Sequence, residues 1–166
     1  MVLLYDLVSI HERIATNKKI ATNKKIATNK KIVSIVDDEI DITVLFENAI
    51  CADITGISVV SFNDPGIALE HFSKNKHAYA LVISDMRMLN MDGLALLNKV
   101  KELNPKVRTM LVSAYDFHNN PIFEKYLQQG IIDSFTEKPI KINRLCQKVR
   151  DEIQAYRQGV KKSNLP

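Results

Sequence analysis

The sequence is poor in cysteine and glycine and has no long apolar run. Two cysteines in 166 residues are too few for a disulfide framework or a four-ligand zinc site, so we expect a reducing, cytoplasmic setting. The five glycines lie too far apart for a dinucleotide fingerprint or a phosphate-binding glycine loop. Asp6 interrupts the apolar residues 1–10, and no cationic residue precedes them. The sequence therefore predicts neither a membrane span nor a signal peptide.

The positive charge of the chain is concentrated near its start. The formal net charge is +4, but residues 1–31 hold seven basic and two acidic residues, a net of +5. The remaining 135 residues therefore sum to about −1. We therefore do not expect residues 32–166 to carry a basic surface that binds nucleic acid.

Three identical copies of Ile-Ala-Thr-Asn-Lys-Lys fill residues 14–31. A period of six places the isoleucines about 120° apart on a helix, and on a strand their face also holds Thr and Lys, so neither geometry builds a core. We interpret the repeat as a solvated linker; the alternative is a basic arm for an anionic partner. Leu3, Leu7, Ile10 and Ile14 have helical spacing, which predicts a short N-terminal helix unless this end is frayed.

From residue 32, short apolar runs alternate with amphipathic stretches. The alternation predicts five βα units in a parallel sheet with helices on both faces, an α/β fold with a buried sheet. We expect residues 1–31 to be an extension, residues 32–157 to be the main domain and residues 158–166 to be a polar tail. The expected strands are residues 32–36, 57–62, 79–84, 107–113 and 131–136, and the expected helices are residues 40–50, 65–72, 93–103, 122–129 and 142–156.

Polar residues follow the strands at the edge where parallel α/β sheets bind ligands. The first strand leads into Asp37 and Asp38, the third into Asp85, the fourth ends at Ser113, and Lys138 follows the fifth. Converging carboxylates favour a hard divalent cation, so Mg²⁺ is expected as a cofactor. A carboxylate beside Mg²⁺ and a lysine is suited to accept a phosphoryl group.

Residues 31–156 resemble the receiver domain of two-component response regulators. The resemblance is carried by five motifs in order, each at an expected strand end or the loop after it: Val-Asp-Asp-Glu at 36–39, Ser-Asp-Met-Arg-Met at 84–88, Met-Asp-Gly at 91–93, Val-Ser-Ala at 112–114 and Glu-Lys-Pro at 137–139. It implies a flavodoxin-like, doubly wound (βα)5 fold with strand order 2-1-3-4-5.

The resemblance also implies roles for the residues. Asp85 would accept a phosphoryl group from a phosphohistidine. Asp37, Asp38, Asp85 and the backbone carbonyl of Arg87 would hold Mg²⁺, and Lys138 would pair with a phosphoryl oxygen. Ser113 would donate its hydroxyl to another oxygen, and Phe135 would be an aromatic switch. The protein would be a signalling switch that assists its own phosphorylation and dephosphorylation, and not an enzyme with a separate substrate.

Each motif also has a structural interpretation. Asp37 and Asp38 could cap a helix, Ser113 could be a turn residue, Phe135 could be core, and Asp92-Gly93 predicts a turn and a helix start without chemistry. The alternative functions are an unphosphorylated scaffold with the receiver fold and, more remotely, a hydrolase of the haloacid dehalogenase type. Such hydrolases need an acid two residues after the nucleophile, where this chain has Arg87.

Some residues depart from the receiver pattern. Leu89 stands where many receivers have Pro, which predicts a looser loop after Asp85. Residues 115–121 and 130–133, which we expect on the signalling face, lack the small residues usual in the family. Lys138-Pro139 is expected to be cis from the resemblance alone. We expect a stand-alone receiver, phosphorylated by a histidine kinase or phosphotransfer protein and acting on an unidentified protein target, with no DNA and no membrane contact.

Overall fold

The five strands form one parallel sheet in the order β2-β1-β3-β4-β5. The computed structural model describes residues 30–115, 117 and 120–163. The order confirms the flavodoxin-like, doubly wound (βα)5 fold, in which the chain reverses direction across the sheet after β2. The strands are β1 (Lys31–Val36), β2 (Ile57–Phe62), β3 (Tyr79–Asp85), β4 (Arg108–Ser113) and β5 (Ser134–Glu137).

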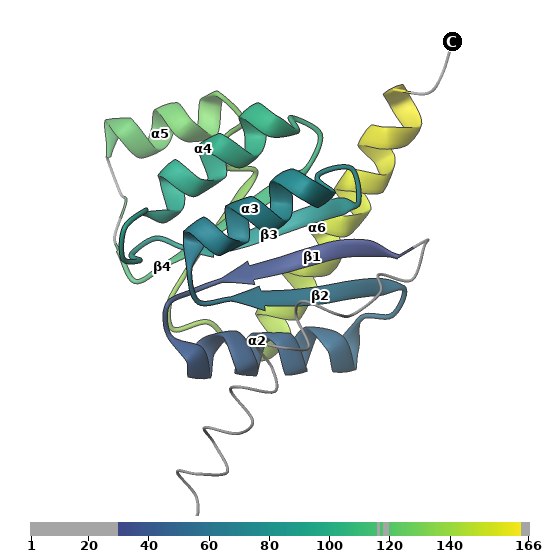
Figure 1. Cartoon of the computed structure of the whole chain (residues 1–166), viewed down its shortest axis with the longest axis horizontal. Coiled ribbons are helices and arrows are strands. Elements are labelled where there is room, and N and C mark those ends of the chain that lie inside the picture. The colour runs from purple at the N-terminus through teal and green to yellow at the C-terminus, as the bar shows by residue number, and fades with distance from the viewer. Residues whose placement is uncertain (1–29, 116, 118–119, 164–166) are drawn as a thin grey trace, which may run out of the picture.

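Helices cover both faces of the sheet, as parallel strands require. In Figure 1, α3, α4 and α5 lie above the sheet and α2 lies below it. The apolar residues of α2 and α6 pack together against one face, and those of α3, α4 and α5 pack against the other. The helices are α2 (Ile40–Asp53), α3 (Pro65–Asn75), α4 (Gly93–Leu103), α5 (Pro121–Gln128) and α6 (Ile142–Ser163).

The two apolar layers meet at β3, whose seven residues are all buried. Successive side chains of a strand point to opposite faces of the sheet, so alternate residues pack into the two apolar layers. Val82 packs into the layer with α3, α4 and α5, whereas Leu81 and Ile83 pack into the layer with α2 and α6. Strands buried on both faces explain the nearly continuous apolar runs of the sequence.

Four expected boundaries differ by three residues or more. Helices α2 and α3 each end three residues later than expected, at Asp53 and Asn75. The fifth strand begins at Ser134 and not at residue 131, because the backbone N–H groups of Ile131 and Ile132 both donate to the Tyr126 carbonyl and close the end of the preceding helix. The last helix runs to Ser163, so residues 158–163 of the expected tail are helical. These residues include no proline, and Gln158, Lys161 and Lys162 are good helix formers, so the helix continues past Gly159 without an apolar pattern.

The predicted N-terminal helix and residues 14–29 of the repeat lie outside the described residues. The end of the third copy does join the fold. Lys31 begins β1, its ammonium donates to the His77 carbonyl at 2.9 Å, and it lies 5.6 Å from the ring centroid of Tyr156. Within the described part of the chain, no helix has both the length and the apolar character needed to cross a membrane.

Candidate functional site

Three carboxylates meet at the carboxyl edge of the sheet. Asp85 is the last residue of β3, and Asp37 and Asp38 directly follow β1, which pairs with β3 so that Val36 lies beside Ser84. Each aspartate offers a carboxylate oxygen, and these oxygens all lie within 4.8 Å of one another. Asp37 and Asp85 are buried, and Asp38 is exposed to solvent. The carboxylates predicted to converge therefore do so, and their oxygens match the hard ligands that Mg²⁺ prefers.

Lys138 reaches this cluster from β5. Its ammonium lies 2.8 Å from Asp37 Oδ2 and 2.6 Å from Asp85 Oδ1. Its backbone N–H donates to the Ser113 carbonyl at 2.8 Å, which fixes the end of β5 against the end of β4. The Lys138-Pro139 peptide bond is cis, as the resemblance implied. The structure thus brings together residues that lie 101 positions apart in the sequence.

Burial and charge act in opposite directions on these groups. Burial raises the pKa of Asp37, and this effect outweighs the hydrogen bonds from Lys138 and from the Glu39 backbone, which lower it. Burial alone would lower the pKa of Lys138, but its bonds to Asp37 and Asp85 together outweigh burial and raise it. The lysine is therefore held as a cation among carboxylates, and the crowded carboxylates favour a further positive charge.

Asp37 also shapes the turn into α2. Its Oδ1 accepts from the Glu39 backbone N–H at 2.9 Å, and Glu39, the N-cap of α2, makes no side-chain capping bond. Asn63 donates from Nδ2 to the Asp37 carbonyl at 2.8 Å and to Thr43 Oγ1 at 3.1 Å. The sequence reasoning missed Asn63, which follows β2 in the way that the other site residues follow their strands. That position was the signal that could have found it.

The loop after Asp85 is built around the Asp85 carboxylate. The Arg87 backbone N–H donates to Asp85 Oδ2 at 2.7 Å, so the residue whose carbonyl was predicted as a metal ligand lies directly beside the cluster. Gly93 passes so close to Asp85 that an added Cβ would lie 2.1 Å from the Asp85 carbonyl oxygen. Asp92 caps α4 by accepting from the Ala95 N–H, as predicted for a helix start. Gly93 has a further role, because only glycine fits there.

Ser113 and Phe135 lie on the neighbouring strands β4 and β5. Ser113 ends β4, and its hydroxyl accepts from the Tyr115 backbone N–H at 2.9 Å. Phe135 is half-buried, with ring centroids 5.4 Å from Phe117 and 5.0 Å from Phe123. A hydroxyl bonded to its own loop is available to change partners. Whether the serine and the ring move stays a prediction.

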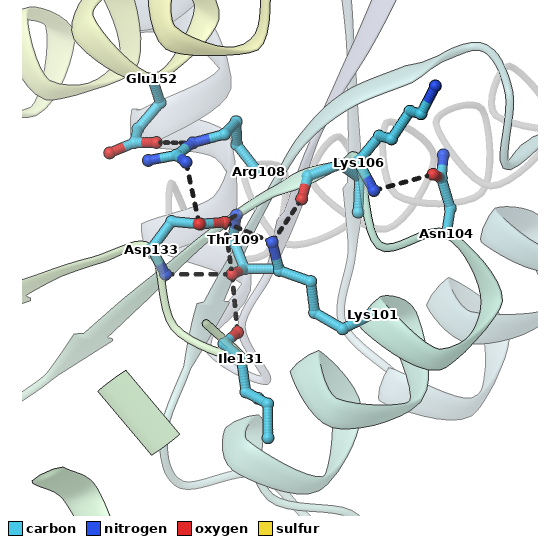
Figure 2. A network of polar contacts seen from close by, with 9 residues as sticks. Lys101, Asn104, Lys106, Arg108, Thr109, Ile131, Asp133 and Glu152 are labelled. Carbon is cyan, nitrogen blue, oxygen red and sulfur yellow. Dashed lines mark hydrogen bonds and ion pairs between the residues drawn. The ribbon is translucent and has the colours of Figure 1, made fainter. Parts of the chain in front are cut away.

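A second polar cluster lies at the opposite, amino edge of the sheet (Figure 2). Asp133, from the segment expected on the signalling face, accepts from Lys101 at 2.6 Å, from Arg108 at 2.9 Å and from the Thr109 backbone N–H at 2.8 Å. Arg108 also donates to Glu152 of α6 at 2.6 Å. The Asp133 side chain is thus used inside the fold, joining α4, β4 and the segment before β5.

Comparison with known proteins gives the family of the chain. Residues 33–150 match the model of the response regulator receiver domain. Over 118 residues the chain is 33% identical to the C4-dicarboxylate transport transcriptional regulatory protein DctD of Rhizobium meliloti, and it is 28% identical over 133 residues to the DNA-binding transcriptional regulator NtrC of Escherichia coli. These matches cover 71% and 80% of this chain but only 24% and 27% of the relatives, about a quarter of their length.

Solved structures show the same fold. A response regulator receiver domain protein from Clostridium thermocellum superposes with a TM-score of 0.68 at 20% identity, covering 77% of this chain and 98% of that one. NtrX from Brucella abortus gives a TM-score of 0.70 at 25% identity, covering 82% of this chain and 30% of that one.

Proposed function

Because this chain belongs to the response regulator receiver domain family, we propose that it is a signalling switch that accepts a phosphoryl group on Asp85 in the presence of Mg²⁺. The observation that supports this most strongly is the joint position of Lys138 and the three aspartates. One ammonium bonds to Asp37 and Asp85, and the Asp38 carboxylate lies in the same cluster. An excess of clustered carboxylates costs stability in a purely structural site, so their presence in one place favours a role in binding or chemistry.

In the proposed reaction, an Asp85 oxygen attacks the phosphorus of a phosphohistidine. The phosphorus–nitrogen bond breaks, the imidazole leaves and takes up a proton, and an acyl phosphate forms on Asp85. Lys138, already 2.6 Å from Asp85 Oδ1, neutralises charge on a phosphoryl oxygen. Asp37, Asp38, Asp85 and the Arg87 carbonyl would hold Mg²⁺, which when bound offsets negative charge on the transferring oxygens.

The proposed output is a conformational change. Phosphorylation adds about 1.5 to 2 negative charges next to Ser113, whose hydroxyl then donates to the phosphoryl group and draws its loop inward. Phe135 packs edge-on against both of the stacked rings of Phe117 and Phe123, so the change reaches α5 through contacts that already exist. The phosphodonor is proposed to be a histidine kinase or a phosphotransfer protein, and the receiver would act on a protein target.

Intact-mass measurement after incubation with acetyl phosphate and Mg²⁺ tests the proposal. We expect one phosphate adduct on the wild type and none on Asp85→Asn. Asp92→Asn is the matched control, because Asp92 caps α4 through the Ala95 N–H and is not part of the carboxylate cluster. It should still take up one phosphate.

Two outcomes would contradict the proposal. No adduct on a folded wild type would favour the unphosphorylated scaffold. An equal adduct on wild type and Asp85→Asn would place the acceptor on another residue.

A further inference from the structure

Arg87 and Tyr115 make a contact that the proposed chemistry does not use. The guanidinium carbon of Arg87 lies 4.5 Å from the ring centroid of Tyr115, the geometry of a cation–π contact. Arg87 is exposed and Tyr115 is 48% exposed, so the pair lies at the surface. Tyr115 is in the segment where the sequence departs from the usual receiver pattern.

Both residues are tied to the site by their backbones. The Arg87 N–H donates to Asp85 Oδ2 at 2.7 Å, and the Tyr115 N–H donates to Ser113 Oγ at 2.9 Å. Each residue thus follows, by two positions, a side chain proposed to contact the phosphoryl group. The Arg87–Tyr115 contact therefore joins the loop after Asp85 to the loop after Ser113.

The aromatic ring is the weaker of two partners that Arg87 could have. An exposed cation–π contact is weak, whereas an arginine binds a phosphoryl group through strong, charge-assisted and often bidentate hydrogen bonds. A phosphoryl group on Asp85 would place about 1.5 to 2 negative charges next to the Arg87 backbone. The guanidinium would therefore form a stronger interaction if it left the ring and bound the phosphoryl oxygens.

We propose that Arg87 is a ligand of the phosphoryl group on Asp85 and is held on the ring of Tyr115 until that group arrives. This inference rests on the proposed function. When the Arg87 guanidinium leaves the ring, Tyr115 becomes free to move as the Ser113 hydroxyl changes its hydrogen-bond partner. Tyr115 lies 5.8 Å from Phe117, whose ring stacks on Phe123 of α5 at 4.4 Å, so the freed loop leads directly to that helix.

A double-mutant cycle tests this inference, with beryllofluoride and Mg²⁺ as the probe of the phosphorylated state. Apparent affinity is measured by ¹⁹F NMR titration, after melting curves confirm that each variant is folded. Arg87→Met removes the proposed ligand and should weaken binding about fivefold or more. Tyr115→Leu frees Arg87 and should strengthen binding about two- to fivefold, while Tyr115→Phe, which keeps the ring, should match the wild type.

The decisive result is the double variant. With Arg87 already replaced by Met, Tyr115→Leu should have no further effect, because its benefit passes through the arginine. Equal effects of Tyr115→Leu in both backgrounds, or no effect of Arg87→Met, would overturn this inference. If the wild type takes up phosphate on Asp85 but the double-mutant cycle gives one of these results, only the proposed role of Arg87 is refuted. A wild type without an Asp85 adduct refutes the proposed function itself.

Discussion

The two edges of the sheet use charge in opposite ways. At the carboxyl edge, three aspartates cluster and Lys138 bonds to two of them, so negative charge is in excess. At the amino edge, Lys101 and Arg108 face Asp133 and Glu152, and the charges balance (Figure 2). A balanced and nearly buried network is suited to hold elements together, whereas an unbalanced cluster is poised to bind or react. The comparison predicts that substitutions at the two edges have different consequences.

The largest expected effect is at the amino edge. Asp133→Asn removes the anion shared by Lys101 and Arg108, and the Asp133 and Lys101 side chains are only 11% and 13% exposed. The substitution leaves Lys101 without its carboxylate and Arg108 with Glu152 alone, so we expect a loss of about 3 kcal/mol in the free energy of unfolding. Urea denaturation followed by circular dichroism measures it.

The matched control for Asp133→Asn is Glu70→Ala. Glu70 pairs with Lys74 on the exposed surface of α3, where ion pairs add little, so the urea midpoint should not move measurably. Similar midpoints for the two variants would contradict the structural role of the amino edge. Asp133→Asn should still take up phosphate from acetyl phosphate under conditions where it is folded.

The next effect is steric and belongs to the carboxyl edge. Gly93→Ala would place a Cβ 2.1 Å from the Asp85 carbonyl oxygen and 2.9 Å from Leu111 Cδ1, so the loop after Asp85 must shift. We expect a loss of about 2 kcal/mol or more in the free energy of unfolding and slower phosphate uptake.

Gly159→Ala controls for the exchange of glycine for alanine. Gly159 lies in α6 with nothing within 4 Å of an added Cβ, so alanine should stabilise the helix by about 0.5 to 1 kcal/mol. A Gly93→Ala variant as stable as the wild type would show that the loop after Asp85 adapts without loss of stability.

A smaller effect is expected at Asp38, where one substitution distinguishes repulsion between the carboxylates from binding of Mg²⁺. Asp38 is exposed and belongs to the carboxylate cluster, so Asp38→Asn should raise the free energy of unfolding without Mg²⁺ by about 0.5 to 1 kcal/mol. With Mg²⁺ at about five times its dissociation constant, the wild type should gain about 1 kcal/mol and Asp38→Asn clearly less. Thermal unfolding with and without Mg²⁺ gives both values. Equal Mg²⁺ stabilisation in the two proteins would remove Asp38 from the ligand set.

The smallest effect is a pH dependence near the amino edge. His71 Nδ1 lies 2.6 Å from the hydroxyl of Tyr79, the first residue of β3. Burial, with a smaller contribution from Lys74, lowers the pKa of His71 below its ordinary 6.5. The unfolded chain then binds more protons than the folded protein, so this contribution to stability is complete above about pH 6.5 and is lost as the pH falls toward the folded pKa.

His71→Gln removes this titration and keeps a polar partner for Tyr79. Urea midpoints between pH 7 and pH 5 should fall less steeply for His71→Gln than for the wild type. Parallel curves would show that His71 does not link protonation to folding.

The sequence predicted much of the carboxyl edge because of how α/β proteins are built. Asp37, Asp85 and Ser113 each follow or end an apolar run, and parallel strands carry such residues to one edge. The predicted bounds of β2 and α4 agree with the structure for the same reason, since apolar pattern and caps define them locally. The last helix was predicted to end near residue 156 but reaches Ser163, because its final turns lack an apolar face.

The amino edge could not be predicted in this way. Asp133 meets Lys101 across 32 residues, and Arg108 meets Glu152 across 44, with no motif to connect them. Gly93 likewise reads as an ordinary helix start, and its contact with the Asp85 backbone depends on how α4 packs on β3.

The order of apolar and polar residues by itself determined the alternation of strands and helices and the placement of Asp37, Asp85 and Ser113 at one edge of the sheet, because these follow from local periodicity and chain direction. The family followed from five short motifs in the sequence. Packing decided which cation meets which anion, where only glycine fits and on which ring Arg87 rests. Those outcomes depend on distances of a few ångströms between segments far apart in the chain, and such distances exist only once the sheet and its helices have come together.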